Sequence, residues 1–80
     1  MANEPLLERI SVDPRVCGGK PCIRGHRIWV SLILDLLADG MSVDEVIEEY
    51  PQLERVDVRA ALAYAARVSV GGFVELTPAA

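Results

Sequence analysis

Residues 10–30 constrain the fold of this chain more than any other segment, because glycines and prolines interrupt them at short intervals. Such interruptions argue against a long helix and favour turns. The apolar–polar alternation of residues 10–12 ends at Pro14, and a second short apolar run over residues 21–24 ends at Gly25. These two runs are predicted to form the strands of a short β-hairpin.

Charge is divided unevenly along the chain. Residues 14–34 carry a charge of +4 with no acidic residue, whereas residues 1–13 carry −2 and residues 35–80 carry −6, which leaves −4 for the whole chain. Nonspecific nucleic-acid binders have a broadly basic surface, whereas the charge of this chain is negative overall. The division instead predicts a small basic patch on an acidic domain.

The length of 80 residues allows one domain, and such a domain buries only about 60 to 65% of the surface of its unfolded chain. Yet 51% of the residues are apolar, which is more than a small monomer easily hides. We therefore expect a homodimer or a complex with another protein. Neither a signal peptide nor a run of membrane-spanning length is evident in the sequence, so we expect a cytoplasmic protein.

Three helices are expected after the hairpin. The first, over residues 29–39, is polar only at three positions spaced four residues apart, so most of its circumference should be buried, with Trp29 as a core anchor. The second begins at a capping box formed by Ser42 and Glu45 and ends before Pro51. The third begins near residue 55 and continues to about residue 70.

The helical period assigns two faces to the third helix. Its core face is predicted to hold Val58, Ala61, Ala65 and Val68, with Leu62 on the border. Its opposite face is predicted to hold Arg55, Arg59, Ala63, Ala66 and Arg67.

The predicted fold is therefore mainly α, with a short N-terminal β-hairpin followed by a three-helix, helix-turn-helix-like bundle. Residues 1–9 are expected to form a flexible N-terminus and residues 10–70 the domain. Residues 71–80 are expected to form a C-terminal tail, in which residues 73–76 are a candidate for one more short strand.

A short capped helix, a four-residue connection and a longer helix match a helix-turn-helix unit, whose last helix enters the DNA major groove. Arg55 and Arg59, one turn apart, are candidates for contacts with guanine edges or phosphates. Lys20, Arg24 and Arg27 on the hairpin are candidates for phosphate contacts that fix the register. Alternatively, these cations are solvated or paired with carboxylates, and the alanine face of the last helix packs against a second copy.

Catalytic and metal chemistry have little support in the sequence. Cys17, Cys22 and His26 are spaced like part of a zinc site, but they lack a fourth ligand, so no metal or other cofactor is expected. The two cysteines are expected to remain thiols, with a redox or zinc switch as the alternative. His26 has no carboxylate or nucleophile at a recognised catalytic spacing, so we expect a protein that is not an enzyme.

Residues 10–66 resemble the bacterial and archaeal family known as domain of unknown function 433. The features that carry the resemblance are Asp13-Pro14, the Cys-Gly-Gly-Lys-Pro-Cys-Ile-Arg-Gly segment over residues 17–25, Arg27, Gly40-Met41-Ser42 and Arg59-Ala60-Ala61-Leu62. Two positions depart from the family pattern. His26 replaces a small hydroxyl residue, and Glu54-Arg55-Val56 replaces a Thr/Pro-type cap, which is stronger than a glutamate cap.

The resemblance implies a helix-turn-helix-like domain that in many cases is the antitoxin of a toxin–antitoxin pair. Such antitoxins bind a toxin that resembles a PIN-domain ribonuclease and repress their own operon as dimers. The first hypothesis is therefore a dimeric DNA-binding antitoxin that binds its toxin through an apolar surface and residues 70–76. The second is a protein-interaction module without DNA binding, whose arginines meet an acidic partner.

Overall fold

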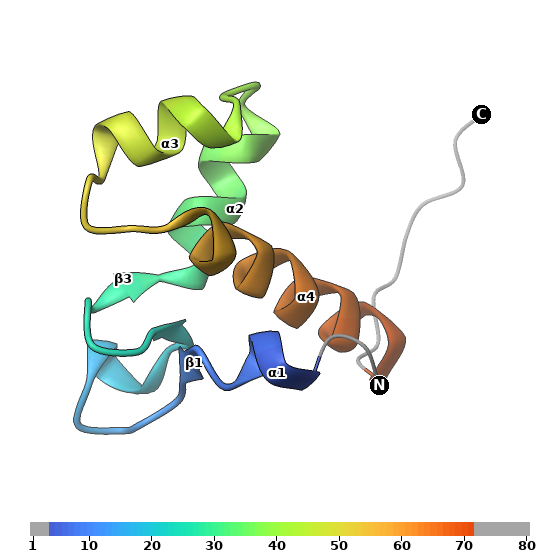
Figure 1. Ribbon diagram of the computed structural model, residues 1–80. Helices are drawn as coiled ribbons and strands as arrows, with labels where there is room; N and C mark the ends of the chain where they lie inside the picture. The colour runs from blue at the N-terminus through green and yellow to red at the C-terminus, as the bar shows by residue number, and fades with distance from the viewer. Residues whose placement is uncertain (1–3, 72–80) are drawn as a thin grey trace.

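The computed structural model describes residues 4–71 (Figure 1). Within this range a small antiparallel sheet lies near the N-terminus and helices make up most of the rest, as predicted. The elements in chain order are α1 (Glu4–Leu7), β1 (Ile10–Ser11), the 3-10 turn η1 (Cys17–Gly19), β2 (Cys22–Ile23), β3 (Ile28–Trp29), α2 (Val30–Ala38), α3 (Val43–Glu49) and α4 (Arg55–Gly71).

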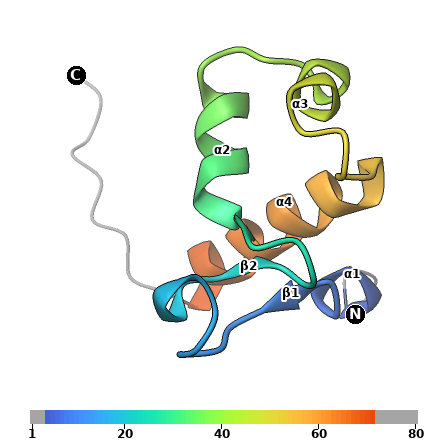
Figure 2. The same ribbon diagram turned by 90° about the vertical axis from the view of Figure 1, so that its left-hand side faces the viewer.

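The predicted hairpin is confirmed, and the sheet has a third strand that was not predicted. β1 pairs antiparallel with β2, so that Ile10 faces Ile23, and β2 pairs with β3, so that Ile23 faces Ile28. The link between β2 and β3 reverses sharply, because Gly25 and Arg27 both adopt positive φ angles of 85° and 57°. This reversal makes residues 28–29 a strand, whereas the sequence analysis assigned Trp29 to a helix. Figure 2 shows the sheet below the start of α2.

The predicted ends of α2 and α3 are close to those observed. α2 ends near Gly40, whose φ of 102° suits glycine and whose N–H donates to the Leu37 carbonyl (3.0 Å). The predicted capping box is present at the start of α3, where Ser42 and Glu45 each accept a hydrogen bond from the other's backbone N–H. Local chemistry therefore accounts for both helix boundaries.

The core lies where the sheet meets α2, α3 and α4. Its fully buried aliphatic side chains include Ile23 from the sheet, Ile33 from α2, Val46 from α3 and Val58 from α4. These four elements cover one another, and each pair among α2, α3 and α4 is in contact. Burial of these aliphatic side chains is the main favourable contribution to folding.

α2 is less buried than predicted. Only Val30 and Ile33 are fully buried, and its four leucines, which are Leu32, Leu34, Leu36 and Leu37, are half-buried. Trp29 is 41% exposed and is not the core anchor expected from the sequence. The physical reason is that a domain of this size has too few elements to surround a helix on all sides.

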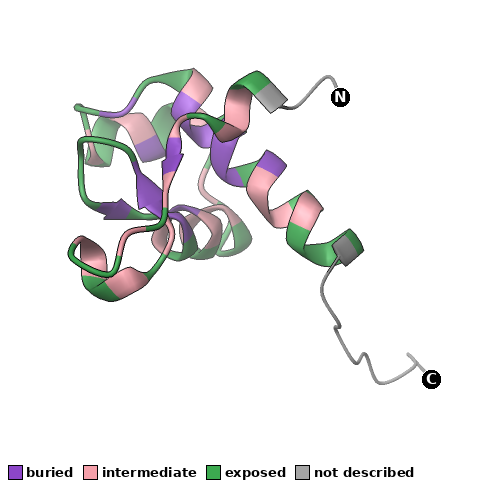
Figure 3. Ribbon diagram, turned by 90° about the horizontal axis from the view of Figure 1, so that it is seen from below, coloured by how far each residue is buried: buried purple, intermediate pink, exposed green. Residues whose placement is uncertain are grey.

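α4 is confirmed as a helix from Arg55, but its predicted core face is correct only in its first half. Val58 and Ala61 are fully buried, whereas Leu62 and Val68 are 47% and 46% exposed. Within residues 4–71, the last turns of α4 continue beyond the other elements (Figure 3). Val68, which belongs to these turns, is exposed. Ala63, predicted to face outward, is buried because α1 packs against α4.

The N-terminus differs from the predicted flexible segment over residues 1–9, because Glu4–Leu7 form α1 and Leu6 packs against the core. The predicted tail strand over residues 73–76 lies outside the described residues. No helix among residues 4–71 combines the length and the apolar character needed to cross a membrane.

Candidate functional site

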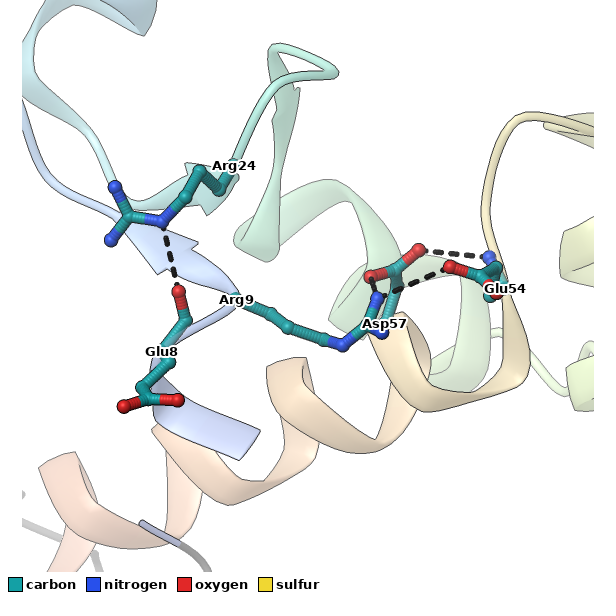
Figure 4. Close-up of polar contacts among 5 residues, drawn as sticks. All are labelled: Glu8, Arg9, Arg24, Glu54 and Asp57. Atoms are coloured by element: carbon teal, nitrogen blue, oxygen red, sulfur yellow. Dashed lines mark hydrogen bonds and ion pairs between the residues drawn. The ribbon is translucent and has the colours of Figure 1, made fainter. Parts of the chain in front are cut away.

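A polar network around the buried carboxylate of Asp57 fixes the start of α4 (Figure 4). Asp57 is 1% exposed, and its Oδ1 accepts a hydrogen bond from Arg9 Nη1 at 2.8 Å. Its Oδ2 accepts from the backbone N–H of Glu54 at 2.8 Å, which satisfies a donor just before the helix. Arg9 also donates to Glu54 Oε2 at 3.3 Å, and its hydrogen bond with Asp57 is the main cause that raises the pKa of Arg9.

This network was missed from the sequence, although one signal was present. Asp57 lies three residues after Glu54, the position from which an acidic side chain reaches back to the residue that caps the helix. Glu54 is a weak cap by its own side chain, so the cap of α4 comes from Asp57 instead. Arg9 carried no comparable signal, because it lies far from Asp57 in the sequence.

Arg24, predicted to contact phosphate, has a structural role on the N-terminal segment. Its Nε donates to the backbone carbonyl of Glu8 at 2.9 Å, and its Nη2 donates to that of Ile10 at 3.0 Å. Figure 4 shows the Arg24 guanidinium directed at this backbone. Arg24 and Arg9 therefore hold the same segment, one against β2 and the other against α4.

The other two hairpin cations are differently placed. The Lys20 ammonium lies 4.2 Å from the centroid of the Trp29 ring, a distance typical of a cation–π contact. Arg27 is exposed in the turn between β2 and β3. Trp29 thus supports Lys20 at the surface, which explains why this aromatic side chain is not fully buried.

Arg55 and Arg59 lie on the outer face of α4, as predicted, and both are exposed. Arg55 forms an ion pair with Asp44 of α3, in agreement with the predicted alternative that carboxylates pair with these cations. Arg59 has no carboxylate partner within residues 5–70. Leu62 and Ala66 continue the same exposed face toward the C-terminus. The outer face of α4 is therefore basic at its start and apolar beyond it.

An apolar groove runs between α2 and α4, on a different flank of α4 from Arg59. It has a volume of about 470 Å³, and Lys20 and Pro21 are among its lining residues. The remaining lining residues come from the two helices and are Val30, Ser31, Leu34, Tyr64, Ala65, Val68 and Ser69. The half-buried Leu34 of α2 and the exposed Val68 near the end of α4 are thus parts of one surface.

A smaller depression of about 240 Å³ lies on the other flank of α4. It is lined by Leu6 of α1 and by Arg59, Leu62, Ala63 and Ala66 of α4. Lys20 and Arg59 therefore border different hollows, and the five predicted cations do not gather into one cluster. Only Arg55 and Arg59 share a face of one helix.

The surface of α3 is acidic. Its exposed side chains are Asp44, Glu45, Glu48 and Glu49. Because α3 contacts α4, these carboxylates lie on an element that adjoins the basic start of α4. The ion pair between Asp44 and Arg55 is one consequence of this arrangement.

Comparison with known proteins supports the resemblance seen in the sequence. The chain is 34% identical over 58 residues to the uncharacterized protein y4eO of Sinorhizobium fredii (strain NBRC 101917 / NGR234), a match that covers 72% of this chain and 26% of that protein. The chain thus spans about a quarter of the length of this relative. No solved structure matches the chain. Residues 10–65 match the family described as "Protein of unknown function (DUF433)", and the chain belongs to this family.

Proposed function

We propose that this protein is a non-catalytic helix-turn-helix regulator of the antitoxin type, which binds operator DNA as a dimer and also binds a PIN-like ribonuclease toxin. The observation that carries the DNA-binding proposal is the exposed pair Arg55 and Arg59 on the outer face of α4. These residues lie four positions apart, so both side chains project from the same side of the helix. Arginine is the side chain best suited to guanine edges and phosphates.

The surroundings of α4 support its use as the helix that enters the major groove. α3 and α2 both contact it, and the Asp57–Arg9 network holds its first turn in place. A helix that presents side chains to DNA must be rigid at the end that carries them. The exposed Ala66 further along the outer face is small and leaves room for the sugar–phosphate backbone.

The contacts of the other cations refine the predicted DNA-binding set. The ion pair between Arg55 and Asp44 is exposed, and exposed pairs are weak, so a phosphate group can displace Asp44. Arg27 is exposed and free to contact a phosphate, whereas Arg24 uses its guanidinium on backbone carbonyls. We therefore assign the main contribution to Arg59 and Arg55, and a smaller one to Arg27.

The test is fluorescence anisotropy with a labelled duplex taken from upstream of the protein's own gene. Arg59→Ala is expected to weaken binding about tenfold, because one good arginine contact contributes about 1 to 3 kcal/mol. Arg15→Ala is the matched control, since it removes the same charge from an 89% exposed side chain that pairs with Asp13 of its own turn. It should change affinity less than twofold. Equal affinity for a second duplex of scrambled sequence would rule out operator binding.

A second candidate function is a protein-interaction module without DNA binding, and the apolar groove between α2 and α4 favours it. The experiment is co-purification with the product of the neighbouring gene. Leu34→Asp, which places a charge in the groove, is expected to abolish the complex. Leu62→Asp places the same charge on the other flank of α4 and is expected to leave it intact. A complex that survives Leu34→Asp would exclude the groove as the binding surface.

A further inference from the structure

The turn between β1 and β2 brings the two cysteine side chains together. Cys17 begins η1 with a φ of 54°, and Gly18 and Gly19 follow with φ angles of 64° and 83°. The N–H of Lys20 donates to the Cys17 carbonyl at 3.1 Å, which closes the turn. The chain therefore folds back on itself, and the Cys17 side chain lies close enough to Cys22 to raise the pKa of the Cys22 thiol.

The two thiols differ in their access to solvent. Cys17 is partly exposed in the turn, whereas Cys22 in strand β2 is 1% exposed. Burial, with a smaller contribution from Cys17, raises the pKa of Cys22 to about 11, so Cys22 is a thiol at neutral pH. An incoming reagent can thus reach Cys17 and not Cys22. A partly exposed thiol beside a buried one suits the roles of an attacking and a resolving thiol.

We propose that Cys17 and Cys22 form a reversible intramolecular disulfide by exchange with a small-molecule disulfide such as oxidised glutathione. The Cys17 sulfur, after losing its proton, attacks one sulfur of glutathione disulfide and releases one glutathione thiol. The Cys22 sulfur then loses its proton, attacks the Cys17 sulfur of the mixed disulfide and releases the second glutathione thiol. The two cysteines are oxidised, glutathione disulfide is reduced, and the two protons leave on the released thiols.

This disulfide would act on the rim of the groove between α2 and α4. The four residues between the cysteines include Lys20 and Pro21, which both line that groove. Lys20 lies over Trp29, and the Pro21 carbonyl accepts a hydrogen bond from the N–H of Val30 at the start of α2 (3.0 Å). Linking Cys17 to Cys22 tightens this segment, so the groove and the environment of Trp29 change together.

The experiment titrates the purified 80-residue chain in buffers of defined glutathione redox ratio, followed by rapid alkylation and mass spectrometry. Both thiols are expected to become protected in one step, with a mass lower by two hydrogens and no interchain dimer. Trp29 is the single tryptophan of the chain, so its fluorescence should change over the same range of redox ratio. A lasting glutathione adduct on the wild-type chain, an interchain dimer, or two thiols alkylated at every ratio would overturn the proposal.

Two variants separate the roles of the cysteines. Cys22→Ala is expected to accumulate the glutathione adduct on Cys17, because no second thiol resolves it. Cys17→Ser is expected to resist oxidation, because the remaining thiol is buried. Alkylation in urea and far-ultraviolet circular dichroism check that each variant is folded. Should Cys22→Ala fail to fold, the one-step loss of both thiols in the wild-type chain still decides the question.

Discussion

Asp57 joins two parts of the protein that are 48 residues apart in the sequence, because its carboxylate accepts a hydrogen bond from Arg9. Its second oxygen accepts from the backbone N–H of Glu54 and so caps α4. A carboxylate that is 1% exposed is tolerated only when donors replace its water. The position of the proposed recognition helix therefore depends on a side chain that contacts no ligand.

We expect Asp57→Ala to lower the free energy of unfolding by about 2 to 3 kcal/mol, since it removes a helix cap and leaves Arg9 without its hydrogen bond to a buried carboxylate. Asp44→Ala is the matched control, because Asp44 also lies in the first turn of a helix and pairs with an arginine, but is exposed. The free energy of unfolding of that variant should fall by about 0.5 kcal/mol or less. Urea denaturation followed by circular dichroism measures both values, and equal losses would contradict the role assigned to Asp57.

The helices depend on their ends as much as on their faces. α3 has only seven residues, and helices of this length are unstable in isolation. At its start, the Ser42 N–H donates to Glu45 Oε1 at 2.9 Å, and the Glu45 N–H donates to the Ser42 hydroxyl at 3.1 Å. The hydrogen bonds with the backbone and then the side chain of Ser42 lower the pKa of Glu45. The cap of α3 is therefore sensitive to acid.

Because the pKa of Glu45 is lower in the folded chain than its ordinary value of 4.5, its contribution to stability is present above that value and is lost as the pH falls below it. We expect Glu45→Gln to lessen the decrease in unfolding free energy between about pH 5 and pH 3. Glu48→Gln, on the exposed surface of the same helix, should retain the wild-type dependence. Denaturation at a series of pH values tests this, and identical curves for the two variants would contradict it.

In the protein as a whole, exposed acidic side chains of α3 lie next to exposed arginines of α4. The net charge of the chain is −4, and the exposed acids of α3 adjoin a helix whose outer face starts with two arginines. An acidic protein is repelled by DNA except where cations face it, so the proposed binding must depend on few contacts and be sensitive to salt. The apolar groove lies on another flank of α4, which allows a protein partner and DNA to bind at different places.

We expect the logarithm of the DNA affinity to fall linearly with the logarithm of the salt concentration, by about 0.9 for each phosphate contact. If Arg59 contacts a phosphate, Arg59→Ala should reduce the magnitude of this slope by about 1 per protomer. Arg15→Ala should leave the slope unchanged. Anisotropy titrations at several salt concentrations measure the slopes, and the same slope for all three proteins would remove Arg59 from the phosphate contacts.

Structural features that depend on only a few neighbouring residues could be predicted from the sequence. The capping box at Ser42, the helix end at Gly40 and the start of α4 near Arg55 all follow from local hydrogen bonding and backbone preference. Helical periodicity correctly placed Val58 and Ala61 inside. It was wrong for Val68, because periodicity identifies the apolar side of a helix and not the length over which another element covers it.

The sequence alone was thus sufficient to predict a mainly α chain with an N-terminal hairpin, the helix caps at Gly40 and Ser42, and the two arginines on one face of α4. Folding in three dimensions added the third strand, α1 against α4, the pairing of Arg9 with Asp57 and the separation of Lys20 from Arg59. Each of these depends on contacts between residues far apart along the chain. Local propensities act over a few residues, so a single sequence does not show which residues far apart along the chain come into contact.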